Sequence, residues 1–102
     1  MSRPIKLVFT YNMKPGREEA CHQYVVEQLG AALTEFGFRF TDAWFTAWGQ
    51  SPQIMGAGLL PDAETARALL TSETWRKAVK GLQAYATDFT VRLIEPAAAF
   101  QI

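Results

Sequence analysis

Cysteine and histidine are nearly missing from this 102-residue chain, which has one of each, Cys21 and His22. A single cysteine excludes an internal disulfide and every metal site that is built from several cysteines. Neighbouring residues of a helix point in different directions, so Cys21 and His22 do not form a cysteine–histidine catalytic pair. We therefore predict no metal site and no cofactor.

The chain also has no formal net charge, because its 10 Lys and Arg residues balance its 10 Asp and Glu residues. Nucleic acids and anionic membrane surfaces attract clustered positive charge, so neither partner is expected. No apolar run is long enough for a signal peptide or a membrane span, which predicts a soluble cytoplasmic protein. The sequence also has no glycine-rich phosphate loop, no G-x-S-x-G motif and no H-E-x-x-H motif.

Apolar residues, at 49% of the chain, are frequent enough for a single folded domain over residues 1–102. Strict alternation of apolar residues predicts a strand over 5–12, which the sequence KPG ends. Apolar residues then recur every three or four positions, which predicts a helix over 17–36 with Gly37 as its C-terminal stop. The apolar stripe of this helix is Cys21, Val25, Leu29, Ala32 and Phe36.

Two further strands are predicted over 38–48 and 53–60, with the sequence GQSPQ as the turn between them. The first is rich in aromatic residues and threonine, which favour strands. Gly56 and Gly58 fall on one face of the second. Two glycines on one strand face indicate a bulge or a group pressed closely against the backbone.

Two short helices follow, the first with Asp62 and the second with Thr71 or Ser72 as N-cap. A last strand is predicted over 88–95. The resulting order, β-α-β-β-α-β, predicts an α+β ferredoxin-like fold, with a four-stranded antiparallel sheet and both helices on one face. The other face keeps apolar residues, so we expect two copies to pack through it as a symmetric homodimer.

The segment KPGREEACHQYV follows the first predicted strand, and LTSETWRKAVKGLQAYATDFTVRLIEP lies near the end of the chain. Together with the element order, these segments resemble the dimeric α/β-barrel superfamily, which includes antibiotic-biosynthesis monooxygenase-like and ethyl tert-butyl ether degradation-like proteins. The resemblance covers nearly the whole chain. It implies a homodimer whose two sheets form a barrel, with a cleft between each sheet and its helices. Its members include cofactor-free oxygenases, haem-degrading enzymes and proteins of no known activity, so it predicts fold better than reaction.

Three ionisable residues are candidates for catalysis. Alternation places Asp42 on the same strand face as Phe40 and Trp44, where a carboxylate needs a partner or a function because burying it alone is costly. Arg92 is the candidate partner; a structural ion pair, a site carboxylate and plain exposure stay open. His22 is a candidate base because histidine titrates near neutral pH, while a glutamate one turn earlier favours a solvated ion pair. The haem-degrading branch carries its histidine on a later segment, so His22 does not match that branch.

Five further residues are candidates for ligand binding. Trp44 and Trp48 pack in the core or dimer interface, or they form a flat wall for a planar ligand. Tyr11, Asn12 and Tyr85 end their elements near the expected mouth of the cleft, where their polar groups can orient a ligand or face solvent.

Two functional hypotheses follow from these candidates. The first is a small enzyme that acts on a planar or aromatic apolar substrate, such as a cofactor-free monooxygenase. Its substrate carbanion would activate oxygen, which requires a base and a dry pocket. The second is a non-catalytic protein of the same fold that binds a small molecule or only dimerises.

Overall fold

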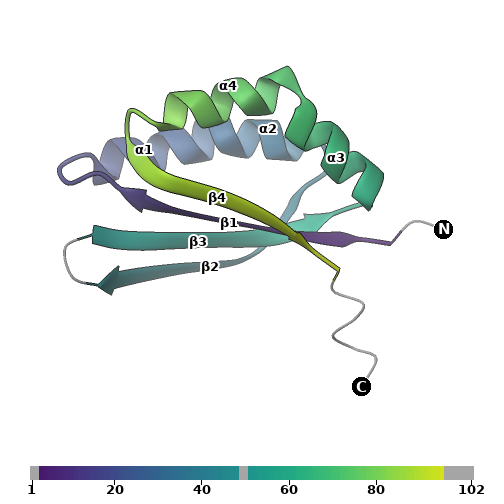
Figure 1. The fold of residues 1–102 in the computed structure, drawn as a ribbon, viewed down its shortest axis with the longest axis horizontal. Helices are drawn as coiled ribbons and strands as arrows, with labels where there is room; N and C mark the ends of the chain where they lie inside the picture. Colours follow the sequence, from purple (N-terminus) through teal and green to yellow (C-terminus); the bar gives the residue numbers. More distant parts are fainter. Residues whose placement is uncertain (1–2, 49–50, 96–102) are drawn as a thin grey trace.

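The computed structural model describes residues 3–48 and 51–95, with side chains described outside residues 44–53. The chain alternates between strands and two helical regions, and each helical region is divided into shorter segments (Figure 1). The elements are β1 (Ile5–Met13), α1 (Glu18–Tyr24), η1 (Val25–Leu29), α2 (Gly30–Glu35), β2 (Arg39–Trp48), β3 (Ser51–Leu60), α3 (Ala63–Thr71), α4 (Glu73–Leu82) and β4 (Ala86–Ile94).

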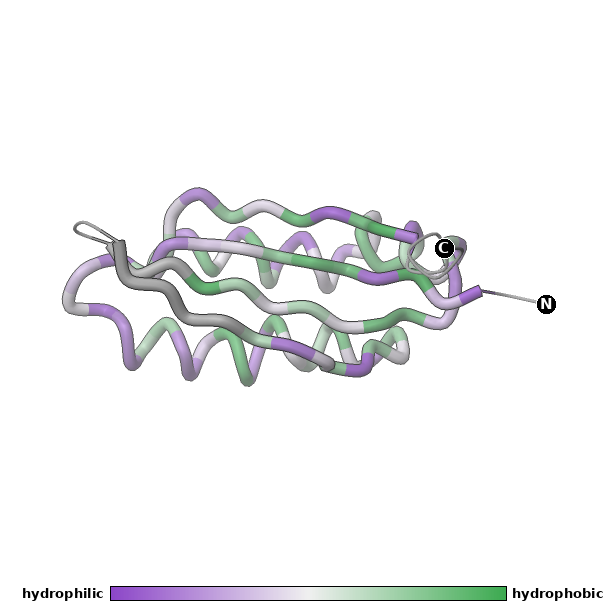
Figure 2. The backbone as a smooth tube through the Cα atoms, turned by 90° about the horizontal axis from the view of Figure 1, so that it is seen from below, coloured by the Kyte–Doolittle hydropathy of each residue, from purple (hydrophilic) through white to green (hydrophobic). Residues whose placement is uncertain are grey.

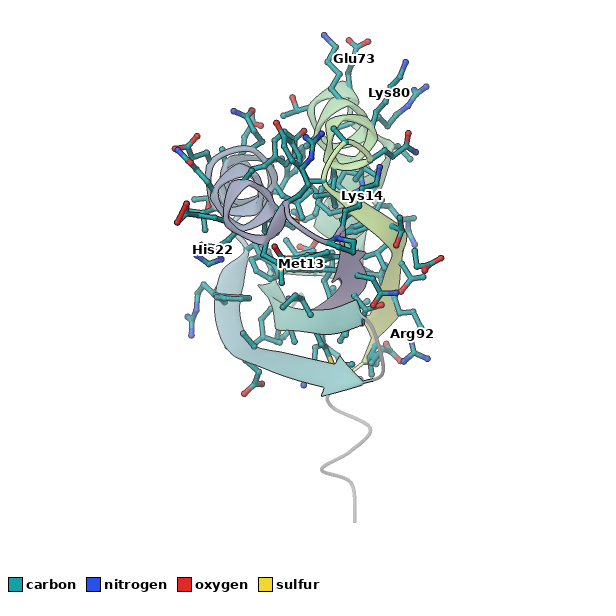
Figure 3. The ribbon with its side chains drawn as sticks, turned by 90° about the vertical axis from the view of Figure 1, so that its left-hand side faces the viewer. Met13, Lys14, His22, Glu73, Lys80 and Arg92 are labelled. Atoms are coloured by element: carbon teal, nitrogen blue, oxygen red, sulfur yellow. The ribbon has the colours of Figure 1, made fainter. Side chains whose placement is uncertain are left out.

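The four strands form one sheet in the order β2-β3-β1-β4, and every neighbouring pair is antiparallel. Both helical regions lie on the same face of this sheet (Figures 1 and 3). The predicted ferredoxin-like α+β fold is therefore confirmed. The opposite face, seen from below in Figure 2, is not covered by any of the described helices. We call it the open face of the sheet.

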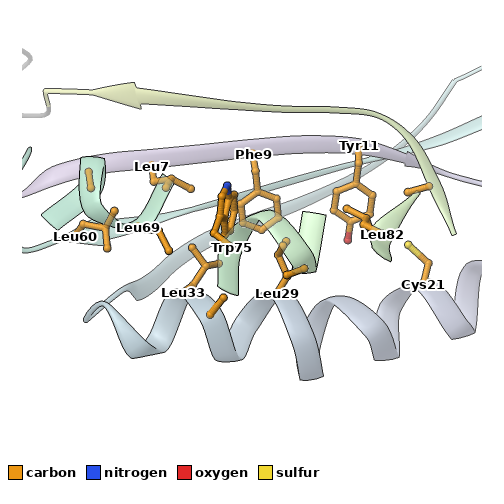
Figure 4. Packing of buried hydrophobic residues seen from close by; sticks show 14 of the residues in the cluster. Leu7, Phe9, Tyr11, Cys21, Leu29, Leu33, Leu60, Leu69, Trp75 and Leu82 are labelled. Atoms are coloured by element: carbon orange, nitrogen blue, oxygen red, sulfur yellow. The ribbon is translucent and has the colours of Figure 1, made fainter. Parts of the chain in front are cut away.

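The core lies between the sheet and the helices, and β1 supplies its central row. Every second residue of β1 is buried, as the alternating sequence predicts. Figure 4 shows the rings of Phe9 and Tyr11 reaching from β1 toward Leu29 and Leu33 of the first helical region. The fully buried large side chains are Leu7, Cys21, Leu29, Leu60, Leu69 and Leu82.

The first helical region covers the predicted residues but contains a π-helical segment, η1, in its middle. A π turn closes on the fifth residue instead of the fourth and shifts the apolar stripe around the helix. The expected stripe faces the core: Cys21, Leu29 and Ala32 are buried, and Val25 and Phe36 are partly buried against it. Leu33 joins the buried set, and Val26 is left 60% exposed. The sequence shows no signal for this turn.

The second helical region agrees with its predicted caps. The Thr65 backbone N–H donates to Asp62 Oδ1 at 2.7 Å, and the Trp75 N–H donates to Ser72 Oγ at 3.2 Å. Of the two candidates for the second cap, Ser72 is thus the correct one. Its extended backbone separates α3 from α4, and Trp75 is buried in the core.

Three glycines explain how β2 and β3 approach the rest of the fold. Gly37 ends the first helical region with a φ of +82°, a conformation that glycine adopts without strain. A Cβ on Gly56 would meet the ring of Phe9, and a Cβ on Gly58 would meet the ring of Phe38. The prediction of a group pressed against this strand is confirmed. The predicted GQSPQ turn is wrong at its end, since β3 already begins at Ser51.

Candidate ligand cavity

An apolar cavity of about 260 Å³ opens between the first helical region and the half of the sheet that ends in the edge strand β2. Its volume lies just under the range of about 300–1,000 Å³ that is typical for drug-sized ligands. It is lined by Phe9, Val25, Val26, Gly30, Leu33, Thr34, Phe38 and Phe40.

The floor and one wall of the cavity are aromatic. Phe9 comes from β1, while Phe38 and Phe40 flank the start of β2 with ring centroids 6.1 Å apart and ring planes tilted by 42°. Phe9 and Phe38 reach these positions because Gly56 and Gly58 leave room for their rings on β3. Aromatic rings in this arrangement offer flat apolar surface to a ligand.

The helical wall contains the π turn. Val25 and Val26 belong to η1, and Val26, like Phe40, stays well exposed, at 60% and 63% respectively. Two large apolar side chains at the rim give the cavity an apolar mouth, a feature that marks ligand or partner sites on soluble proteins. π turns also occur often at functional sites, because they displace side chains from the regular helical stripe.

The cavity offers shape and dispersion contacts rather than charge. None of its eight lining residues is ionisable. The one hydroxyl among them, Thr34 Oγ1, donates to the Gly30 carbonyl at 2.8 Å and is thereby satisfied within the helix. A molecule that enters this cavity is therefore selected by apolar surface and size.

Other hollows of the surface have a different character. One of about 480 Å³ is lined in part by Lys14 and Asp88, and one of about 380 Å³ by Arg3, Asp62, Glu64 and Glu95. Charged side chains around an open hollow are usually solvated, so these two are poorer sites for an apolar ligand.

Tyr11, expected at the mouth of the cleft, lies in the core instead. It is only 4% exposed, and its ring stacks on Phe9 with centroids 6.2 Å apart. Burial, with the Cys21 thiol nearby, raises the pKa of Tyr11 to about 12. The phenol is thus neutral at physiological pH, and it lies in the core rather than at the place from which it was expected to orient a ligand.

Asn12 and Tyr85 make their contacts outside the apolar cavity. Asn12 Nδ2 donates to Asp88 Oδ2 at 3.1 Å across β1 and β4. Tyr85 packs on Tyr24 with ring centroids 5.3 Å apart, and the Tyr24 hydroxyl donates to the Ala78 carbonyl at 2.7 Å. Burial, and secondarily Tyr85, raises the pKa of Tyr24. Neither predicted residue lines the apolar cavity.

The three candidate catalytic residues do not lie together at one site. A bulge in β2 between Phe40 and Asp42 turns Asp42 onto the open face, so the expected shared face with Phe40 is wrong. Asp42 and Arg92 stand on β2 and β4, the opposite edges of the sheet, and therefore do not pair within one chain. His22 is exposed on the flank of α1, on the other side of the molecule from Arg92 (Figure 3).

Trp44 and Trp48 have side chains outside the described residues, so their roles stay predictions. Their backbones belong to β2, where Trp44 pairs with Met55 and Trp48 with Ser51. Across residues 3–48 and 51–95, no group of three or more His, Cys, Asp or Glu side chains is arranged to hold a metal ion. In the same ranges, no helix is long and apolar enough to cross a membrane.

Neither the known protein families nor the curated proteins contain a match to this sequence. Solved structures do match its fold. A conserved protein of Bacteroides thetaiotaomicron, described as a possible oxidoreductase, has a TM-score of 0.69 at 18% identity over 93% of this chain and 99% of its own. A NIPSNAP domain protein from Burkholderia xenovorans has a TM-score of 0.67 at 15% identity over 92% of this chain and 95% of its own.

A third similar structure is SnoaB, a cofactor-independent oxygenase from Streptomyces nogalater, with a TM-score of 0.64 at 11% identity. The match covers 89% of this chain and 92% of SnoaB. Identities this low show a common fold and carry no reaction over from one protein to another. The ferredoxin-like fold expected from the sequence is thus confirmed.

Proposed function

We propose that this protein is a homodimer that binds a small, flat, uncharged molecule in the apolar cavity between η1, α2 and the first half of β2. The observation that carries this proposal is the lining of the cavity, which is apolar throughout except for one internally bonded hydroxyl. An ionised ligand group inside it would lose water without gaining a partner. Neutral one- or two-ring aromatic compounds match its volume of about 260 Å³.

A cofactor-free monooxygenase is the second candidate, favoured by the apolar lining of the cavity and by the fold shared with SnoaB. Such a reaction would oxidise a substrate CH₂ to a carbonyl with O₂, releasing the second oxygen atom as water. The eight lining residues include no base. The substrate would therefore have to be acidic enough to lose its own proton, so binding without turnover is the function that the geometry supports best.

Calorimetric titration with 2-naphthol, a neutral two-ring probe, tests the binding proposal. We expect saturable binding with one site per chain and a negative heat-capacity change, which marks the burial of apolar surface. Phe40→Ala should weaken binding because it removes the exposed ring at the mouth. Ile94→Ala, which truncates another exposed apolar residue outside the cavity, is the matched control and should bind like the wild type.

Two further measurements complete the test. Oxygen consumption with acidic phenols separates turnover from binding, and light scattering gives the native mass. Absence of heat with any one- or two-ring probe, from a folded protein, would refute the ligand proposal. A monomeric mass would refute the dimer.

A further inference from the structure

A second hollow, of about 480 Å³, lies where α4 leads into β4, beside the end of β1. Its volume falls within the range of about 300–1,000 Å³ that is typical of ligand sites. We call it the Lys14 cavity. It is lined by Lys14, Val79, Leu82, Gln83, Ala86, Thr87, Asp88 and Phe89. It shares no lining residue with the apolar cavity and combines apolar residues with one cation and one carboxylate.

The floor of the Lys14 cavity is apolar. Val79 and Leu82 stand three positions apart on α4, so they lie on the same face of the helix. Phe89 comes from β4 and is partly buried against the core. Its ring stacks on Phe9 with centroids 6.3 Å apart and packs on Trp75 at 6.0 Å, which holds it in place. Such a surface suits a ring or a short alkyl chain.

Lys14 borders this floor at the point where β1 ends. Its backbone N–H donates to the Tyr85 carbonyl at 2.9 Å, which fixes the lysine beside the turn between α4 and β4 (Figure 3). Lys14 is half-buried. A half-buried lysine packs its methylene stem on apolar neighbours and keeps its ammonium group at the rim, in water. The cavity thus joins an apolar floor to a positive charge.

The carboxylate of the Lys14 cavity is already bonded. Asp88 belongs to a bulge of β4, since the pairing with β1 shifts register between Thr10 and Asn12. Its φ of +56° is uncommon for a residue other than glycine. The Asp88 carboxylate accepts from Asn12 Nδ2 at 3.1 Å, and Asn12 does not line the cavity. Bulges often re-aim a side chain next to a binding site, and this one leaves Lys14 as the charge available to a ligand.

The end of α4 is bonded in the same way. Free carbonyl groups at a helix C-terminus carry partial negative charge and would repel an anion. The last carbonyls of α4 each accept a backbone N–H from the following turn. These pairs are Lys80 with Gln83 at 3.2 Å, Gly81 with Ala84 at 3.3 Å and Leu82 with Tyr85 at 2.9 Å.

We propose that the Lys14 cavity is a second binding site, which takes an amphipathic carboxylate. The apolar body of the ligand lies on the floor, and its carboxylate accepts from the Lys14 ammonium. A charge-assisted hydrogen bond of this kind is about twice as strong as a neutral one. The site does not depend on the apolar cavity, because the stacked rings of Phe9 and Phe89, one from each lining, separate the two.

Calorimetric titration with 2-naphthoate tests this site, because the probe has the rings of 2-naphthol and adds a carboxylate, which the apolar cavity disfavours. We expect one saturable site per chain. Lys14→Gln removes the charge, keeps most of the stem and should weaken binding at least about tenfold. Lys77→Gln is the matched control: it removes the same charge from α4 outside the Lys14 cavity and should bind like the wild type. The cation 2-naphthylmethylammonium should bind more weakly than 2-naphthoate.

Methyl groups report where the probe binds. In NMR, 2-naphthoate should shift those of Val79 and Leu82 and leave that of Val26, in the apolar cavity, unchanged. Lys14→Gln should still bind 2-naphthol as the wild type does, so the two sites can fail separately. Three results would each overturn the second site whatever 2-naphthol does: no binding of 2-naphthoate to protein that circular dichroism shows to be folded, equal binding by Lys14→Gln, or tighter binding of the cation.

Discussion

Replacing Gly58 by alanine tests how closely β2 and β3 are fitted to the aromatic wall of the cavity. A Cβ at this position would lie 2.7 Å from Phe38 Cε1, and it would also meet the Arg39 carbonyl oxygen. The ring can turn, but the carbonyl is fixed by the β2–β3 ladder, in which Arg39 pairs with Leu59. Part of the strain therefore falls on the backbone.

The size of the effect follows from opposing contributions. Overpacking costs about 1–3 kcal/mol, and contact with a fixed carbonyl places Gly58→Ala near the upper end. The lost flexibility of the unfolded chain offsets about 0.4–1 kcal/mol. The net loss is about 2 kcal/mol, which lowers the Tm of a chain of this length by about 8–16 °C. Gly30→Ala is the control: its Cβ would lie 3.4 Å from the Val25 carbonyl oxygen, and the helix should gain about 0.5–1 kcal/mol.

Thermal and urea unfolding followed by far-ultraviolet circular dichroism measure both variants. We expect the urea midpoint to fall for Gly58→Ala and to rise for Gly30→Ala, with unchanged slopes. A Gly58→Ala protein as stable as the wild type would show that Phe38 and β2 are not held where the structure places them.

Three further changes have defined outcomes. Leu29→Ala removes a fully buried side chain and should cost about 2–5 kcal/mol in urea unfolding. The Thr65 N–H lowers the pKa of Asp62 below its usual 3.8. Above pH 3.8, Asp62 should therefore make the protein more stable than Asp62→Asn. This difference in the free energy of unfolding should disappear as the pH falls through the folded-state pKa. Tyr11 keeps its proton to about pH 12 in the folded state, whereas the unfolded chain releases it near pH 10. The free energy of unfolding should therefore fall as the pH rises from about 10 to about 12. In Tyr11→Phe, which has no phenol to ionise, this fall should be smaller.

The sequence predicted the element order and the main helix boundaries because these depend on local signals. Each of these signals acts within a few residues: the alternation in β1, the caps Asp62 and Ser72, and the helix stop at Gly37. Such signals reflect backbone and burial preferences that hold wherever the segment packs. The fold follows from their order.

The site could not be predicted in the same way. One extra residue in β2 inverts the face of everything after it, so alternation alone misplaced Asp42 relative to Phe40. The order of the strands, which separates Asp42 from Arg92, also depends on pairing between distant segments. The cavity lining combines a π turn with residues from β1 and β2, and no local sequence pattern predicts that these segments meet.

Binding inside the apolar cavity is the central claim, and methyl-resolved NMR during titration with 2-naphthol tests it most directly. We expect saturable shifts at the methyl groups of Val25, Val26 and Leu33, which line the cavity. The methyl groups of Leu69 and Leu82, buried in the core elsewhere, should stay in place. Shifts confined to residues outside the cavity, or no shifts at a saturating concentration of the probe, would contradict binding in the cavity.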